Sequence, residues 1–185
     1  CEAPSKLDAE YLWNDVDDYG AEIWWEAPEL PVDPEGWIRW DDGTLASGIG
    51  LTDGGDWTVA IRWDAGQLAE YDGTSITKMQ IALNDEGYTA INLKIWSGAN
   101  ASTLLWESGD QTPIAGVWTE FTVDPPVVLD VDAELWVGYD IVGQSAGDFP
   151  AGTDGGPAVA GYGDKITTDG IGWDNLSDFG LDYNW

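Results

Sequence analysis

The sequence predicts an all-β protein: an antiparallel β-sandwich with about nine short strands. Three observations lead to this prediction. Several segments alternate apolar and polar residues with a period of two, as in WTVAIRW at residues 57–63. The chain contains 24 Gly and 9 Pro, and its 24 Asp outnumber its 11 Glu, a composition that favours turns over helices. No helical period is sustained. A jelly-roll and a fibronectin-like arrangement both fit this pattern.

The chain begins with an acidic stretch that has no sustained period, and residues 1–20 are therefore predicted to form an extended N-terminal arm. The sandwich domain is predicted to span residues 21–185. Its first strand is expected around Ile23 to Trp25, because the prolines that follow end the strand. A second strand is expected in GWIRWD at residues 36–41.

The clearest strand is WTVAIRW. Four apolar side chains share one face, and a smaller, more polar set takes the other, which is typical of a half-buried strand. The apolar face carries Trp57, Val59, Ile61 and Trp63. After it, Asp64 is expected to cap a short helix at about residues 67–71, and Asp72-Gly73 is expected to end that helix.

Five more strands are predicted from the same alternation. The turn segments that separate them are NDEG, SGANAS, a loop around Pro113, and DPP at residues 124–126. The predicted strands are ITKMQIAL, YTAINLKIW, TLLWES, VWTEFTV and ELWVGYDIV, at residues 76–83, 88–96, 103–108, 117–123 and 134–142.

The charge of the chain excludes several function classes. Its net charge is -29, which repels nucleic acid backbones and anionic lipid surfaces. It contains no His, so catalytic triads and metal sites that need imidazole are excluded. No apolar run is long enough to cross a membrane as a helix.

The N-terminal residue suggests a cellular setting. Cys1 is the only cysteine and Met79 the only methionine, so the chain is expected to have been processed before Cys1. A processed N-terminal Cys resembles that of a bacterial lipoprotein, which implies a lipid anchor at Cys1. The alternative is an ordinary free thiol.

Several longer segments resemble a known family. IWWEAP resembles the first strand of a fibronectin type III-like module. The series from GWIRWDDG through LKIWSGANASTLLWE and FPAGTDGGPAVAGYGDKI to GLDYNW resembles an adhesin-like β-sandwich domain of secreted and surface proteins of Bacteroidota. This resemblance spans residues 21–185. It implies an extracellular, adhesive or structural setting and no catalytic residues.

The same resemblance suggests how copies could assemble. In those relatives the domain continues past DYNW, so the last strand here is expected to be incomplete and its edge open. An arm from a neighbouring copy could fill an open edge by strand addition, and a head-to-tail contact of this kind builds filaments. The alternative is an arm that packs on its own domain. The predicted interface residues are Tyr11, Leu12, Trp13, Val16 and Tyr19, with Trp13 as the anchor.

Asp-rich turns are candidate calcium sites, because Ca²⁺ prefers carboxylate oxygens. Ordinary turn residues are the alternative reading, and no segment matches the helix-loop-helix calcium pattern. The candidate ligands are Asp15, Asp17, Asp53, Asp56, Asp130 and Asp132.

The sequence thus predicts a non-enzymatic extracellular protein, because no pair of carboxylates is set apart by an apolar motif that would tune it for catalysis. Its expected role is that of a self-assembling filament or surface-layer subunit, joined by its N-terminal arm. The second hypothesis is a monomeric surface lipoprotein that binds carbohydrate, because the 13 Trp could stack on sugar rings. Packing of these Trp in the core is the alternative use.

Overall fold

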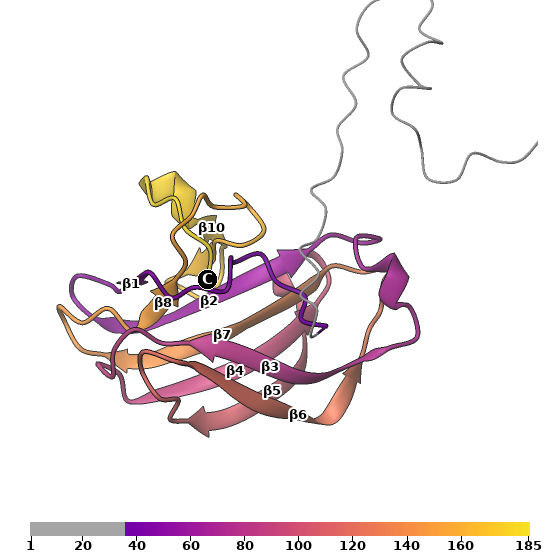
Figure 1. The fold of residues 1–185 in the computed structure, drawn as a ribbon, viewed down its shortest axis with the longest axis horizontal. Coiled ribbons are helices and arrows are strands. Elements are labelled where there is room, and N and C mark those ends of the chain that lie inside the picture. Colours follow the sequence, from indigo (N-terminus) through magenta and orange to yellow (C-terminus); the bar gives the residue numbers. More distant parts are fainter. Residues whose placement is uncertain (1–35) are drawn as a thin grey trace, which may run out of the picture.

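The computed structural model of the chain describes residues 36–185. The predicted arm at residues 1–20, the start of the sandwich at residue 21 and the predicted strand around residues 23–25 lie outside this range. Within it the protein is all-β, as predicted, and its strands are antiparallel and form two layers (Figure 1).

One layer is a six-stranded sheet with the order β10-β9-β2-β7-β4-β5. The other layer consists of two strand pairs, β3 with β6 and β1 with β8. The strands are β1 (Ser47–Ile49), β2 (Gly55–Trp63), β3 (Ser75–Ala82), β4 (Ala90–Ser97), β5 (Thr103–Gln111), β6 (Trp118–Val128), β7 (Leu135–Gln144), β8 (Ala151–Thr153), β9 (Lys165–Thr167) and β10 (Asp174–Asn175). Short 3₁₀ turns are η1 (Ala69–Tyr71), η2 (Ala99–Ala101) and η3 (Leu176–Phe179).

The pairing of the first eight strands identifies the type of sandwich. β1 pairs with β8, β2 with β7, β3 with β6 and β4 with β5, all antiparallel. This is one long antiparallel ribbon rolled over two layers, which is the arrangement of a jelly roll. Of the two predicted arrangements, the structure therefore has the jelly-roll one, with β9 and β10 added beside β2.

The core lies between the layers and follows the predicted alternation. Trp57, Val59 and Trp63 of β2 are buried in it, and Ile61 packs against it. The neighbouring strands contribute alternating residues to the same cluster, among them Ile91, Leu93, Ile95, Leu135, Tyr139 and Ile141. The strand predictions for residues 57–63, 76–83, 88–96, 103–108, 117–123 and 134–142 are thus confirmed in position, with shifts of a few residues at their ends.

The other face of the six-stranded sheet is covered as well. Ala60 is buried there with Trp96 and Trp136, and Trp173 from the C-terminal segment packs on both tryptophans. The face of β2 that was expected to be polar therefore forms a second, smaller apolar cluster.

Three local predictions are wrong. Residues 36–41 form a loop with one isolated bridge at Ile38 instead of a strand. Their side chains are held by contacts outside the segment, because Trp40 is buried against Trp63 and donates Nε1–H to the Arg62 carbonyl at 2.8 Å. Tertiary contacts here override the local pattern.

The second wrong prediction is the break at DPP, since β6 continues through Pro125 and Pro126 to Val128. Among the described residues β6 pairs only with β3, and edge strands tolerate proline. The register shift opposite, between Ile76 and Lys78, accommodates the extra residues.

The third wrong prediction is the cap at Asp64. Its carboxylate caps no helix but accepts a hydrogen bond from the Tyr162 hydroxyl at 2.6 Å and pairs with Arg62 at 2.9 Å. The short helix is confirmed only as the 3₁₀ turn η1, which ends at Asp72 as predicted.

Candidate functional site: a groove beside strand β3

The second layer opens between β3 and β8. The two strands meet at an antiparallel bridge between Leu83 and Ala151 and share no ladder beyond it. Within residues 36–185, β3 pairs with β6 alone, so its other edge has no strand partner from Ser75 to Ile81. Such an edge offers backbone donors and acceptors to a further strand.

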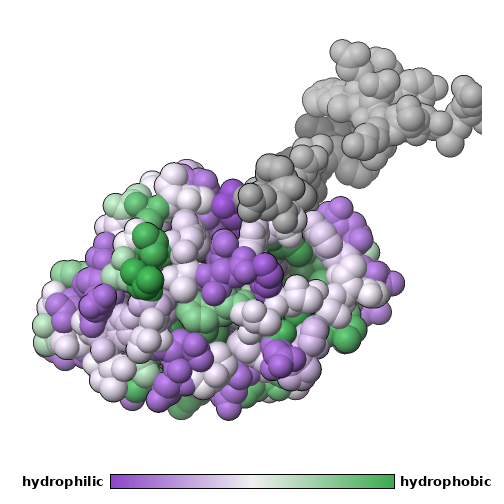
Figure 2. Space-filling model, turned by 60° about the horizontal axis from the view of Figure 1, so that its bottom comes forward, coloured by the Kyte–Doolittle hydropathy of each residue, from purple (hydrophilic) through white to green (hydrophobic). Residues whose placement is uncertain are grey.

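A cavity of about 590 Å³ lies along this edge. β3 forms one side of it and Gly152, Thr153 and Asp154 the other, while the inner faces of β2 and β7 form its floor. Apolar (green) surface is visible in hollows between hydrophilic residues in Figure 2. The apolar residues lining the cavity include Val59, Ile61, Ile76, Met79, Ile81, Leu135, Val137 and Tyr139. The cavity thus reaches the core of the sandwich, and we call it the β3 groove.

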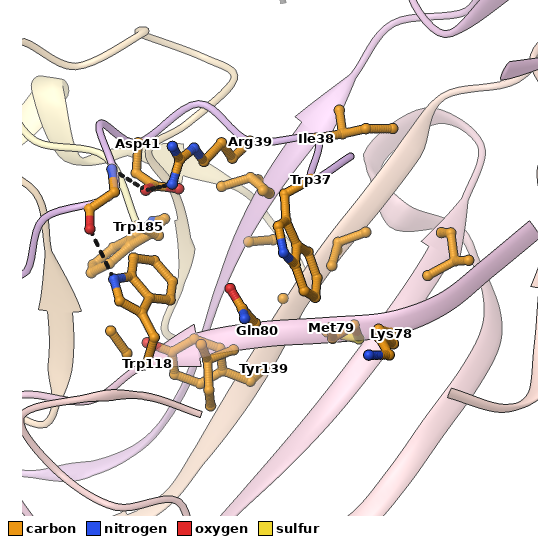
Figure 3. Close-up of a pocket in the computed structure, with 18 of the residues that line it drawn as sticks. Trp37, Ile38, Arg39, Asp41, Lys78, Met79, Gln80, Trp118, Tyr139 and Trp185 are labelled. Carbon is orange, nitrogen blue, oxygen red and sulfur yellow. Dashed lines mark hydrogen bonds and ion pairs between the residues drawn. The ribbon is translucent and has the colours of Figure 1, made fainter. Parts of the chain in front are cut away.

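The loop of residues 36–45 crosses the β3 groove. Trp37 is half-buried and stands over β3, near Met79 and Gln80 (Figure 3). Trp118 of β6 donates its Nε1–H to the carbonyl of Gly43 at 3.0 Å, which ties the loop to the far side of β3. These two indole rings therefore line the groove together with those of Trp63 and Trp185.

Two of the chain's six basic side chains also line the groove, although the net charge is -29. Arg39 lies 3.9 Å from the Asp41 carboxylate, and Lys78 pairs with Glu120 of β6 at 2.7 Å. Burial raises the pKa of Asp41, which the Gly43 N–H hydrogen bond and the Arg39 charge partly offset. The groove is therefore an apolar channel with cationic groups at its rim.

Two buried polar atoms on the groove wall lack a hydrogen-bond partner among residues 36–185. They are Nε1 of Trp63 and Oγ1 of Thr153, and both residues are about 2% exposed. Buried polar groups usually have partners, because an unmade hydrogen bond costs about 1–3 kcal/mol. A bound group with polar atoms would satisfy them.

The predicted calcium ligands are not gathered at one place. Asp56 of β2 accepts a hydrogen bond from the Gly143 N–H of the neighbouring strand β7 at 2.7 Å, and Asp130 stabilises its own turn by accepting one from Asp132 N–H at 3.1 Å. Asp53 lies in the exposed turn before β2. Residues 36–185 contain no group of three or more Cys, Asp and Glu placed to hold a metal ion. Asp15 and Asp17 lie outside the described residues, so calcium binding stays a prediction.

The predicted arm residues, Tyr11, Leu12, Trp13, Val16 and Tyr19, and the lipidation residue Cys1, also lie outside the described residues. DYNW, which was expected in an incomplete last strand, forms no strand; within the described residues the last strand, β10, and β3 each have one edge without a strand partner. DYNW is held in place: Asn184 is buried against Asp154, and Trp185 packs on Trp57.

The β3 groove itself was not predicted from the sequence. GWIRWD supplies four of its lining side chains, Trp37, Ile38, Arg39 and Asp41, although its alternation of apolar and polar residues predicts a strand. The groove exists because β3 and β8 diverge from their single bridge. No pattern in the sequence of either segment indicates this divergence.

Two further findings bear on function. None of the helical turns in the described part of the chain is long and apolar enough to cross a membrane. Comparisons of the chain with models of protein families, with curated proteins and with solved structures found no match.

Proposed function

We propose that this protein is a non-enzymatic extracellular subunit that assembles head to tail, and that the β3 groove receives the N-terminal arm of the next copy. The observation that carries the proposal is a strand edge that has no partner in the described part of the chain and runs beside an apolar channel. Strand addition needs these two features together, because the edge supplies backbone hydrogen bonds and the channel accepts alternate side chains.

The arm and the groove match in length. The open edge from Ser75 to Ile81 is about 23 Å long at roughly 3.3 Å per residue. The segment from Tyr11 to Val16 spans about 20 Å when extended. It presents alternate apolar side chains, with Tyr11 and Trp13 on one side and Leu12 and Val16 on the other.

Their charges match as well. The arm is acidic, with Asp15, Asp17 and Asp18 beside Val16 and Tyr19, and the groove rim carries Arg39 and Lys78, whose ion pairs with Asp41 and Glu120 would exchange for carboxylates of the arm. Complementary charges speed association and fix the register of a bound strand. In the same proposal, Cys1 carries a lipid that anchors the first subunit at a cell surface.

The first test compares the full chain with a variant that lacks residues 1–20. Sedimentation velocity and negative-stain microscopy are expected to show polymers for the full chain and monomers for the truncated chain. If the truncated chain forms the same polymers, the arm is not the donated strand and the proposal fails.

The second test locates the contact. The arm is added to the truncated chain as a free peptide of residues 1–20, and amide hydrogen exchange is measured. Protection is expected at those amides between Ser75 and Ile81 of β3 that point away from β6, because these amides gain partners. The outer edge of β5 (Thr103–Gln111) is a matched control, since β5 is an edge strand of the other layer, the six-stranded sheet. Protection of β5 without β3 would place the contact elsewhere and contradict the proposal.

Carbohydrate binding in the same groove is a second candidate, favoured by the rings of Trp37 and Trp118 and by the unpartnered polar atoms of Trp63 and Thr153. Indole rings stack on sugar C–H faces, and jelly rolls include lectin domains. Titration of the truncated chain with neutral oligosaccharides, followed by tryptophan fluorescence, tests it. A saturable response that is lost in Trp37→Ala, together with monodisperse full-length protein, would favour this function over assembly.

A further inference from the structure

Lys165 and Asn175 face each other across the two strands at the C-terminal edge of the six-stranded sheet. They are register partners in the antiparallel pair of β9 and β10. The Lys165 ammonium donates a hydrogen bond from Nζ to Oδ1 of Asn175 at 2.7 Å. An amine therefore lies in contact with a side-chain carboxamide.

A carboxylate lies on the other side of the same carboxamide. Asn175 donates from Nδ2 to Oδ2 of Asp178 at 3.0 Å, and its backbone N–H donates to the same oxygen at 3.1 Å. Asp178 thus touches the nitrogen that would leave if the amine attacked the amide carbon.

The three residues are held on a rigid base. Ile166 and Leu176, which follow Lys165 and Asn175 directly, are buried in the main core. Leu176 also donates its backbone N–H to the Asp164 carbonyl at 2.8 Å. Reacting groups that are fixed in contact react far faster than the same groups free in solution.

The surroundings favour the neutral amine. Lys165 is half-buried, and its Nζ lies 5.9 Å from the ring centroid of Trp136. Burial lowers the pKa of Lys165, and the Arg62 charge lowers it further, against the opposing effect of Asp164, Asp178 and Asp174. A desolvated lysine is a better nucleophile because more of it is uncharged.

We propose that Lys165 and Asn175 form a covalent isopeptide bond, assisted by Asp178. Lys165 gives up one proton to solvent, and the neutral Nζ moves from the Oδ1 lone pair to the face of Cγ and attacks it. The Nζ–Cγ bond forms, the Cγ–Nδ2 bond breaks, and Asp178 transfers one of the two Nζ protons to Nδ2, while the other stays on the new amide nitrogen. Ammonia leaves and takes up the proton in solution as ammonium, so the reaction needs no oxidant and no cofactor.

Such a bond would join β10 and η3 permanently to β9. None of Lys165, Asn175 and Asp178 lines the β3 groove, and the bond forms whether or not copies of the protein assemble. The proposal therefore stands or falls separately from the proposed function.

Trypsin gives a direct readout in the full-length protein. Uncrosslinked chain is cut after Lys94 and Lys165, which yields peptides 95–165 and 166–185. An isopeptide-bonded Lys165 resists cleavage, so a single peptide 95–185 is expected, lighter than its sequence mass by one ammonia. The folded protein is incubated at mildly alkaline pH before digestion, to let the reaction reach completion.

Variants assign the bond to these residues. Lys165→Arg is expected to abolish the loss of ammonia and to restore cleavage at residue 165, because a guanidinium does not attack the amide. Asp178→Ala is expected to slow bond formation at least tenfold. Lys94→Arg is the matched control, since Lys94 pairs with the Asp140 carboxylate and not with an amide, and the loss of ammonia is expected to persist.

The proposal is overturned if peptides 166–185 and 95–165 of the wild-type chain are recovered at their full sequence masses after incubation. It is also overturned if ammonia is lost but cleavage after Lys165 persists, because that pattern indicates cyclisation within an Asn residue. Both outcomes are read from the wild-type chain and do not depend on whether the variants fold.

Discussion

Trp185 packs edge-on against Trp57, with their ring centroids 6.1 Å apart and their planes at 62°. Its Nε1–H also donates to the Lys165 carbonyl at 2.8 Å. The side chain is 9% exposed, so the last residue of the sequence is part of the main core. It ties the C-terminal segment to both β2 and β9.

The first prediction concerns this contact. Trp185→Ala is expected to lower the free energy of unfolding by about 3–5 kcal/mol, because it removes a buried indole and leaves a cavity. Ile171→Ala is the control: Ile171 is 86% exposed, and a change of less than about 0.5 kcal/mol is expected there. Urea unfolding measures the free energy of unfolding of both variants. Equal losses of stability in the two variants would show that Trp185 is not a core residue.

The second prediction concerns the close approach of β2 and β7. A Cβ added at Gly138 would lie 2.0 Å from the Val59 carbonyl oxygen and 2.7 Å from Cα of Ala60. Since both are backbone atoms of a neighbouring strand, Gly138→Ala is expected to destabilise the fold by about 1–3 kcal/mol. Gly172→Ala meets nothing within 4 Å and is expected to be neutral. Thermal unfolding compares them, and a neutral Gly138→Ala would mean that the strands separate easily.

The third prediction concerns Arg62, which links three elements on the outer face. Its guanidinium pairs with Asp64 at 2.9 Å and Glu134 at 3.4 Å, and it donates from Nε to the Gly161 carbonyl at 2.7 Å. It also lies over the ring of Tyr162. Lysine keeps the charge, but its ammonium group cannot form the same set of contacts as the planar guanidinium. Arg62→Lys is therefore expected to lower the free energy of unfolding by about 1–3 kcal/mol.

The control for Arg62→Lys is Lys78→Ala. Lys78 forms an ion pair with Glu120, but its side chain is 51% exposed, so its removal is expected to change stability by less than about 1 kcal/mol. Chemical unfolding at low and at high salt measures the free energy of unfolding of Arg62→Lys and of Lys78→Ala. A larger loss for Lys78→Ala than for Arg62→Lys would contradict the role assigned to the guanidinium.

The sequence predicted those parts of the fold that depend on local alternation. The apolar face of β2 is an example, since Trp57, Val59 and Trp63 follow a strict period of two and all lie in the core. The cover of the opposite face could not be predicted, because Trp173 reaches Trp96 and Trp136 from a distant loop. Contacts of this kind depend on the chain path and leave no pattern in either segment.

The candidate site was less predictable than the fold. GWIRWD alternates like a strand, yet Trp40 is fixed by the Arg62 carbonyl and Asp41 by the Gly43 N–H, so the segment turns across the groove. An open edge was expected at the last strand, and the structure has a longer one at β3 that was not predicted. Whether an edge is open depends on which strands meet, and the meeting of Leu83 with Ala151 is a property of the topology.

The last prediction concerns pH and two adjacent carboxylates with opposite behaviour. Burial raises the pKa of Asp41 above its ordinary value of 3.8, and the Asp154 charge adds to this. A carboxyl whose pKa is raised in the folded state stabilises the fold below about 3.8, and this contribution is lost as pH rises through the folded pKa. Asp41→Asn keeps an oxygen that can accept from the Gly43 N–H, and it is expected to stabilise the protein relative to wild type at neutral pH.

Asp42 provides the comparison, because the side-chain and backbone hydrogen bonds from Thr44 lower its pKa. Its contribution to stability is present above 3.8 and is lost as pH falls through the folded pKa, so Asp42→Asn is expected to lose a little stability at neutral pH. The free energy of unfolding of both variants and of wild type is measured from pH 3 to pH 7 at constant ionic strength. The two differences of interest are those between each variant and wild type. They are expected to have opposite signs at pH 7 and to shrink toward pH 3, as the wild-type carboxyl groups become protonated. If Asp41→Asn is destabilising at pH 7, the ionised carboxylate is required beside Arg39, and the pairing of those two groups outweighs the cost of burying the charge.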